Sequence, residues 1–248
     1  MYFACSNNNL TMLDLDLNND FIRSSNKIKD LLMTDQYAIY QMINDESTII
    51  LKMHFEFGQT EERNIIDRNM IARLLFVHQE ILRQICVNIE NPNELTCLVM
   101  KHSRVTSQYC EDIYFQFPFI KTNINRIVSV ILPNLKHFFR ETEIHRSIRV
   151  SPMNNIDDIL SEDIYRNRLW PIPRSYIDGR PVKFIAVFDN ISINEIKQEK
   201  IHYYKPIDYF SEYNSEYSLP KGSTISESNL LYFTNTNGFT VIQSPNEQ

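Results

Sequence analysis

The chain has 248 residues, of which 43% are hydrophobic and 23% charged, an ordinary balance for a globular protein of one large or two small domains. Its four glycines do not form the paired spacing of a Walker loop, which excludes a nucleotide-driven motor of the P-loop type. With 31 acidic against 25 basic residues the net charge is -6, so binding of nucleic acid requires a local basic patch.

Cysteine usage and hydropathy bear on the compartment. Cys5, Cys86, Cys97 and Cys110 lie far apart, form no CxxC pair and are too few for a disulfide scaffold, which favours a reducing environment. The chain contains no apolar run of about 18 residues and does not begin with a secretion-signal pattern. We therefore expect a soluble intracellular protein that has no contact with a membrane.

The first half of the chain predicts strands around one long helix. Residues 1–36 are polar and rich in Asn, with one helix expected at 26–33, and predict a loosely organised lead-in. Residues 37–43 and 48–57 predict two strands joined as a hairpin by the intervening NDES turn. Apolar residues at spacings of three and four then predict a helix over about 61–89, with Thr60 as its cap.

The second half of the chain also predicts strands and helices, in a less regular order. Strands are predicted at 95–101, 113–119 and 182–188, and short helices at 124–138 and 156–165, the first of them kinked at Pro133. Beyond residue 189 the chain is rich in Tyr, Ser and Asn, and only 229–234 and 239–242 suggest strands.

The order of elements from 37 to 188 predicts an α+β fold with a largely antiparallel sheet and helices on one face. We expect strands 47–57, 95–101, 113–119 and 182–188 to share that sheet, with the long helix packed on it. The predicted organisation is a lead-in at 1–36, a single α+β domain at 37–190 and a C-terminal extension at 191–248.

Three segments in this order carry a family resemblance. Residues 37–57 form the hydrophobic frame of a strand that would end in two aspartates, EDIYFQFPFI (111–120) matches a strand with Gly-x-His followed by Phe-Pro, and residues 162–189 match a segment with Asp, Asn-Trp and a Gly-Ser-Lys element. Together they resemble the amino-terminal primase domain of helicase–primases from nucleo-cytoplasmic large DNA viruses, within the archaeo-eukaryotic primase superfamily. The resemblance covers about residues 37–190.

Primases of this type hold two divalent metals on clustered carboxylates. The resemblance places His54 and Glu56 at the aspartate pair, Tyr114 at the histidine and Ser161 near a later aspartate. At the Gly-Ser-Lys element stand Arg174, Ser175 and Tyr176, of which only the serine matches.

These departures change the expected chemistry. A strand would place His54 and Glu56 on one face, but they carry half the negative charge of two aspartates, so metal binding there should be weak if it occurs. A phenol at Tyr114 cannot replace a protonatable imidazole. Three acids near Ser161 remain as substitute ligands: Asp158, Glu162 and Asp163.

Three other features have a functional interpretation and a structural alternative. Asp14 and Asp16 form the only literal Asp-x-Asp pair, for which a helix cap or solvated turn is favoured over a metal motif. A basic segment around Trp170 suits phosphate or single-stranded DNA or RNA, although nearby acids could pair with it; it comprises Arg166, Arg168, Arg174, Ser175, Arg180 and Lys183. Trp170 itself is favoured as a packing anchor. Tyrosines 203, 204, 209, 213 and 217 suggest a protein interface.

The leading hypothesis is a non-catalytic, degenerate primase-like viral protein that binds other viral proteins as part of a replication, transcription or virion assembly. One alternative is an active divergent primase–polymerase that uses His54, Glu56 and a nearby acid with Mg or Mn. The other is a virion structural protein that never contacts nucleic acid. The leading hypothesis needs no cofactor and places the protein in the host cytoplasm, a viral factory or the virion.

Overall fold

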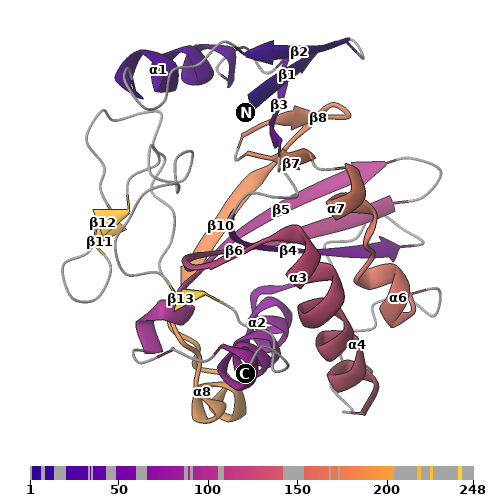
Figure 1. The fold of residues 1–248 in the computed structure, drawn as a ribbon, viewed down its shortest axis with the longest axis vertical. Helices are drawn as coiled ribbons and strands as arrows, with labels where there is room; N and C mark the ends of the chain where they lie inside the picture. The colour runs from indigo at the N-terminus through magenta and orange to yellow at the C-terminus, as the bar shows by residue number, and fades with distance from the viewer. Residues whose placement is uncertain are drawn as a thin grey trace.

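The computed structural model describes residues 2–6, 9–13, 21–32, 34, 36–42, 49–59, 66–86, 89, 92–105, 109–141, 154–167, 169–172, 174–203, 217–218, 224–225 and 240–241. These residues form an α+β fold, as the order of elements predicted. Two sheets lie one above the other, and most of the helices lie below the larger sheet (Figure 1).

The larger sheet, here called the central sheet, contains the four strands expected to share it. They are β4 (Ile49–Gln59), β5 (Cys97–Val105), β6 (Tyr109–Thr122) and β10 (Lys183–Phe188). All pair antiparallel, β10 with β5, β5 with β6 and β6 with β4, while β13 (Thr240–Val241) adds a short parallel pair to β6. This confirms the predicted, largely antiparallel sheet.

One face of the central sheet is apolar and lies against helices (Figure 1). Alternate residues of β4, including Met53, Phe55 and Phe57, belong to the same buried cluster as Leu74 and Leu82 of the long helix. Because side chains alternate across a strand, this face removes every second β4 residue from water. Burial of apolar area against the helices is therefore the main stabilising contribution on this side.

Helix α2 (Arg68–Ile85) is the long helix, and it is shorter than the 61–89 predicted. Its cap is Asp67, whose carboxylate accepts a hydrogen bond from the backbone N–H of Met70 at 2.8 Å. It ends at Cys86, which has an extended backbone. Thr60, the predicted cap, lies outside the described residues.

The second helical stretch consists of α3 (Ile124–Arg126), the π turn η2 (Ile127–Ile131) and α4 (Leu132–Glu141). In the π turn the N–H of Leu132 donates to the carbonyl of Ile127, five residues earlier. Pro133 follows directly, and because a proline ring clashes with the carbonyl four residues before it, the wider turn accommodates the ring. The distortion predicted at Pro133 is therefore present as a π turn.

The smaller sheet, here called the outer sheet, corrects the prediction of a loose lead-in. It contains β1 (Tyr2–Ser6), β2 (Asn9–Leu13), β3 (Ala38–Met42) and β7 (Leu169–Pro171) in the order β2-β1-β3-β7. Helix α1 (Phe21–Leu32) joins it through a small separate core that includes Ile28 and Leu32. The lead-in has no long apolar run, but β1 pairs with β3, β2 pairs with β1, and the small core buries Ile28 and Leu32, which together order it.

The predicted hairpin of residues 37–43 and 48–57 is wrong. β3 pairs with β1 and β7 in the outer sheet, whereas β4 pairs with β6 in the central sheet. Alternation along a sequence indicates a strand but does not specify its partner. The boundary predicted at residue 37 falls inside the outer sheet for the same reason.

The remaining elements are short. β8 (Tyr176–Ile177) and β9 (Arg180–Pro181) form a hairpin whose two turn residues, Asp178 and Gly179, have φ of 48° and 77°, as a tight Asp-Gly turn requires. The others are η1 (Pro92–Leu95), α6 (Ile156–Ile159), α7 (Asp163–Asn167), α8 (Ile193–Gln198), β11 (Tyr217–Ser218) and β12 (Thr224–Ile225). The strand expected at 229–234 lies outside the described residues. None of the described helices is long and apolar enough to cross a membrane.

Candidate polar site between the two sheets

The second face of the central sheet is polar and lies under the outer sheet. Cross-strand neighbours form rows on this face: Lys52 with Gln116, His54 with Tyr114, and Glu56 with Asp112. β5 adds His102 beside Asp112, and Arg104 one step further along the strand. From the outer sheet, Trp170 packs edge-on against Tyr114, with ring centroids 5.2 Å apart, and Gln41 accepts a hydrogen bond from Lys52.

Asp112 is the centre of the polar contacts and is 2% exposed. Its carboxylate lies 3.0 Å from His54 Nε2, 2.8 Å from Arg104 Nε and 3.5 Å from His102 Nδ1. Burial alone would raise the pKa of Asp112, but the hydrogen bonds from His102 and His54 and the charge of Arg104 together hold that pKa well below its ordinary value. Asp112 is therefore a buried carboxylate that stays ionised.

Arg104 joins this buried group to the edge of the site. Its terminal nitrogen lies 2.7 Å from Glu56 Oε2, while its Nε contacts Asp112. The side chains of Arg104 and Glu56 are 25% and 35% exposed, so this end of the site reaches solvent. Burial alone would lower the pKa of Arg104, but the neighbouring charges of Asp112 and Glu56 raise it above its ordinary value.

The ligand atoms of His54, Glu56 and Asp112 all lie within 4.8 Å of one another. One imidazole and two carboxylates are donors that a divalent cation accepts. The same two carboxylates, however, each bind the guanidinium of Arg104, which already supplies positive charge between them. A cation could bind only in competition with this arginine.

The prediction that His54 and Glu56 share a strand face is confirmed, but the sequence analysis missed Asp112. Asp112 precedes Tyr114 by two residues, so the period of β6 places both on one face, and the strand register puts Asp112 beside Glu56. The alternation of side chains along β6 can be read from the sequence, whereas the register between β6 and β4 cannot. Tyr114 stacks on His54 with centroids 4.8 Å apart, and burial raises its pKa well above the usual value, so it is a neutral phenol.

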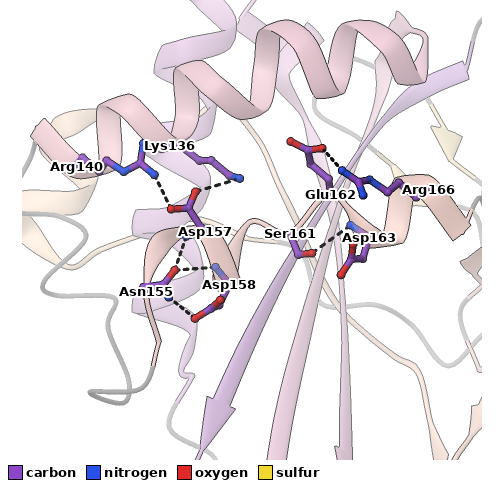
Figure 2. A network of polar contacts seen from close by, with 9 residues as sticks. All are labelled: Lys136, Arg140, Asn155, Asp157, Asp158, Ser161, Glu162, Asp163 and Arg166. Atoms are coloured by element: carbon purple, nitrogen blue, oxygen red, sulfur yellow. Dashed lines mark hydrogen bonds and ion pairs between the residues drawn. The ribbon is translucent and has the colours of Figure 1, made fainter.

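Ser161 does not join this group. Its hydroxyl accepts a hydrogen bond from the N–H of Asp163 at 3.1 Å and so caps α7, as Figure 2 shows. Two of the three acids considered as substitutes have partners nearby: Glu162 binds Arg166 at 3.2 Å, and Asp158 accepts from Asn155. The third, Asp163, begins α7. Among the described residues, the third acidic partner of His54 and Glu56 is Asp112 instead.

The same region contains a structural clamp. Lys136 and Arg140 of α4 lie 3.2 and 2.7 Å from the carboxylate of Asp157 in α6 (Figure 2). The Asn155 side chain caps α6 by accepting from the N–H groups of Asp157 and Asp158. Asp157 therefore links α6 to α4.

The basic residues of the segment around Trp170 lie on several elements. Arg166 lies on α7, Arg180 on β9 and Lys183 at the exposed start of β10. Arg174 has a left-handed backbone with φ of 67°, and its N–H donates to the carbonyl of Val182. Arg168 lies outside the described residues.

Ser175 does not suit the expected phosphate contact. It is fully buried, and its hydroxyl donates to the carbonyl of Ile39 at 2.6 Å and accepts from the N–H of Ile39 at 3.0 Å. It therefore attaches the loop after β7 to β3. Trp170 is buried, in agreement with its expected packing role.

Of the tyrosine-rich stretch, Tyr203 packs on the folded domain. The guanidinium of Arg68 lies 4.5 Å from its ring centroid and donates to its hydroxyl, and Phe188 lies 5.9 Å from it, centroid to centroid. Tyr217 belongs to β11. The tyrosines at 204, 209 and 213 and the pair Asp14 and Asp16 lie outside the described residues.

No family model matches the chain, and no curated protein matches its sequence.

Proposed function

We propose that this protein is a non-catalytic primase-like protein that acts as a binding or scaffold component of a replication, transcription or virion assembly of a large DNA virus. The observation that carries the proposal is Arg104, whose guanidinium contacts both Glu56 and Asp112. A primase needs the charge of its carboxylates for divalent metals, and here that charge is compensated within the protein.

The energetics support this interpretation. Two-metal chemistry requires cations that neutralise charge on phosphate oxygens as the transition state forms. A guanidinium fixed between two carboxylates has its donors directed at them, and a cation that displaced it would leave a partly buried arginine without partners. Strong Mg²⁺ or Mn²⁺ binding is therefore disfavoured while Arg104 is present.

Manganese binding tests the proposal directly. We expect the wild-type protein to bind Mn²⁺ weakly in calorimetry and to make no template-dependent primer with Mg²⁺ or Mn²⁺. Arg104→Gln should bind Mn²⁺ at least about tenfold more tightly, because Glu56 and Asp112 lose their competing cation. Arg104→Lys, which keeps the charge, is the matched control and should remain weak.

The active alternative is favoured by one observation, the convergence of His54, Glu56 and Asp112 within 4.8 Å. On that alternative the wild-type protein makes primer, and both Glu56→Gln and Asp112→Asn abolish it. A robust product with this pattern would overturn the non-catalytic proposal.

Nucleic-acid binding separates the remaining possibilities. If Arg180 and Lys183 contact phosphate, replacing both with Ala should weaken binding of single-stranded DNA and flatten its salt dependence, whatever the sequence. Absence of binding even at low salt would favour a scaffold or virion component that contacts only protein.

A further inference from the structure

Lys52 is a buried amine at the layer between the two sheets, and burial lowers its pKa from 10.5 to about 7. It is 3% exposed, and its amine donates to the side-chain carbonyl of Gln41 and lies 5.4 Å from the ring centroid of Trp170. Among the described residues, no carboxylate lies within ion-pair distance of this amine. A buried charge is normally paired, because removal from water is costly.

Two further donors near Lys52 also have no partner in the described part of the chain. Gln116, its direct cross-strand neighbour, is 5% exposed, and its Nε2 makes no hydrogen bond. The Nε1 of Trp170, whose ring lies over the amine, is likewise unpartnered at 1% exposure. Buried polar groups are nearly always hydrogen-bonded, so two such donors beside an amine that has no ion-pair partner need a common explanation.

The three groups share one property, the donation of hydrogen bonds. The amine of Lys52, the amide nitrogen of Gln116 and the indole nitrogen of Trp170 all donate hydrogen bonds. The acids on the same face, Glu56 and Asp112, stand two rows further along the strands and bind Arg104. The surroundings of Lys52 therefore favour a ligand that accepts hydrogen bonds and carries negative charge.

We propose that the central and outer sheets enclose a binding site for one small oxyanion of the phosphate type, held by Lys52, Gln116 and Trp170. The site does not depend on the proposed function, since it uses none of the residues that contact Arg104. A water molecule would satisfy the two neutral donors but would do little to keep the proton on Lys52, whereas an oxyanion accepts from both donors and favours the charged form of the amine. The ion would also join the two sheets, because Trp170 comes from the outer sheet and the other two residues from the central one.

Inorganic phosphate is the probe, and Trp170, the single tryptophan of the chain, is the reporter. At neutral pH and equal ionic strength, phosphate but not chloride should raise the melting temperature in a saturable manner and change the Trp170 fluorescence. Lys52→Met should lose both responses. Lys183→Met, on the exposed start of β10, is the matched control and should keep them.

A second variant keeps the test decisive if Lys52→Met folds poorly. Gln116→Glu has nearly the same shape and places a carboxylate beside Lys52, so it should melt at a higher temperature in chloride and respond to phosphate at least about tenfold more weakly. Equal responses of the wild-type protein to phosphate and chloride would overturn the proposal and leave water as the partner of these donors.

A nucleoside triphosphate separates a free ion from a phosphate group on a larger ligand. Because Lys52, Gln116 and Trp170 are each at most 5% exposed, inorganic phosphate should act and the triphosphate should not. A response to the triphosphate alone would overturn the assignment to a small ion.

Discussion

The two faces of the central sheet are built from the same strands and are stabilised by different forces. Below it, Phe55, Phe115 and Phe117 belong to the same apolar core as α2. Above it, His54 and Asp112 are almost as well removed from water, and with the partly exposed Arg104 they are held by hydrogen bonds and charge. Alternation along each strand sends every second residue to the opposite face, so one sequence run supplies both environments.

This difference predicts which face of the sheet tolerates substitutions. An apolar face tolerates changes that keep volume, because hydrophobic burial has no direction. A buried polar face tolerates few changes, since each unpaired group left behind keeps its full desolvation cost. The polar face therefore depends on precise register, and the outer sheet that covers it depends on the same contacts.

The largest effect should come from the centre of the polar face. Asp112→Asn removes the charge that pairs with His54, His102 and Arg104 and leaves a partly buried arginine with Glu56 alone, which should lower the free energy of unfolding by about 3–5 kcal/mol. Urea denaturation measures this loss. Asp30→Asn on the exposed surface of α1 is the control and should change stability by less than about 0.5 kcal/mol. Similar losses in both variants would mean that Asp112 is not the key partner of this face.

A smaller effect on stability is expected from His78, a polar side chain on the apolar face. His78 is fully buried among Phe55, Phe115 and Phe117, and neither ring nitrogen has a partner among the described residues. Burial lowers its pKa from 6.5 to about 3. The folded state therefore holds the neutral ring while the unfolded chain takes up a proton, so the stability present above pH 6.5 should decline as the pH falls towards 3.

His78→Leu isolates this contribution. The variant should be more stable than the wild type by about 1–3 kcal/mol at neutral pH, because a buried polar group without partners is removed. Its advantage should grow on acidification by at most about 1.4 kcal/mol for each pH unit. Urea denaturation at several pH values measures both, with His137→Leu on the exposed surface of α4 as the control. A pH-independent difference would show that the ring is not buried in the neutral form.

A substitution at the edge of β4 that faces away from β6 should cost less stability. The side-chain amide of Asn154 donates to the carbonyl of Gly58 and accepts from its N–H, both at 2.9 Å, and so replaces a neighbouring strand. Asn154→Ala should cost about 1–2 kcal/mol and increase hydrogen exchange at the Gly58 amide. Asn69→Ala, in the exposed first turn of α2, should leave that amide unchanged. Unaltered exchange in Asn154→Ala would refute the edge contact.

The smallest effect should lie outside both faces. Asp157→Asn breaks the contacts with Lys136 and Arg140, but all three side chains are near solvent, so the loss should stay within about 1 kcal/mol. High salt should reduce the difference from the wild type, which urea denaturation at two salt concentrations measures. A loss as large as that of Asp112→Asn would show that the exposed and the buried charges contribute equally to stability.

Local patterns explain which parts of the fold were predictable. The strands of the central sheet and the core of α2 were found because their apolar residues repeat with periods of two and near 3.6, which short-range geometry imposes. The hairpin of residues 37–57 was wrong because strand pairing depends on distant partners, and the lead-in was underestimated because β1 pairs with β3, more than thirty residues later, and β2 pairs with β1. The caps Asp67 and Ser161 followed local rules, although the first was assigned to Thr60 and the second was overlooked.

The sequence by itself determined the α+β class, the shared central sheet and the placement of His54 and Glu56 on one strand face, because each follows from periodicity along a single segment. Only the tertiary structure decided that Asp112 and Arg104 complete this group and that the outer sheet covers Lys52. Asp112 and Arg104 lie eight positions apart on neighbouring strands, but the register between β4 and β6 brings His54 to Asp112 across 58 positions, and no local rule encodes that register. Without that register and the outer sheet, the same polar residues could lie on a solvated strand face and form no buried polar group.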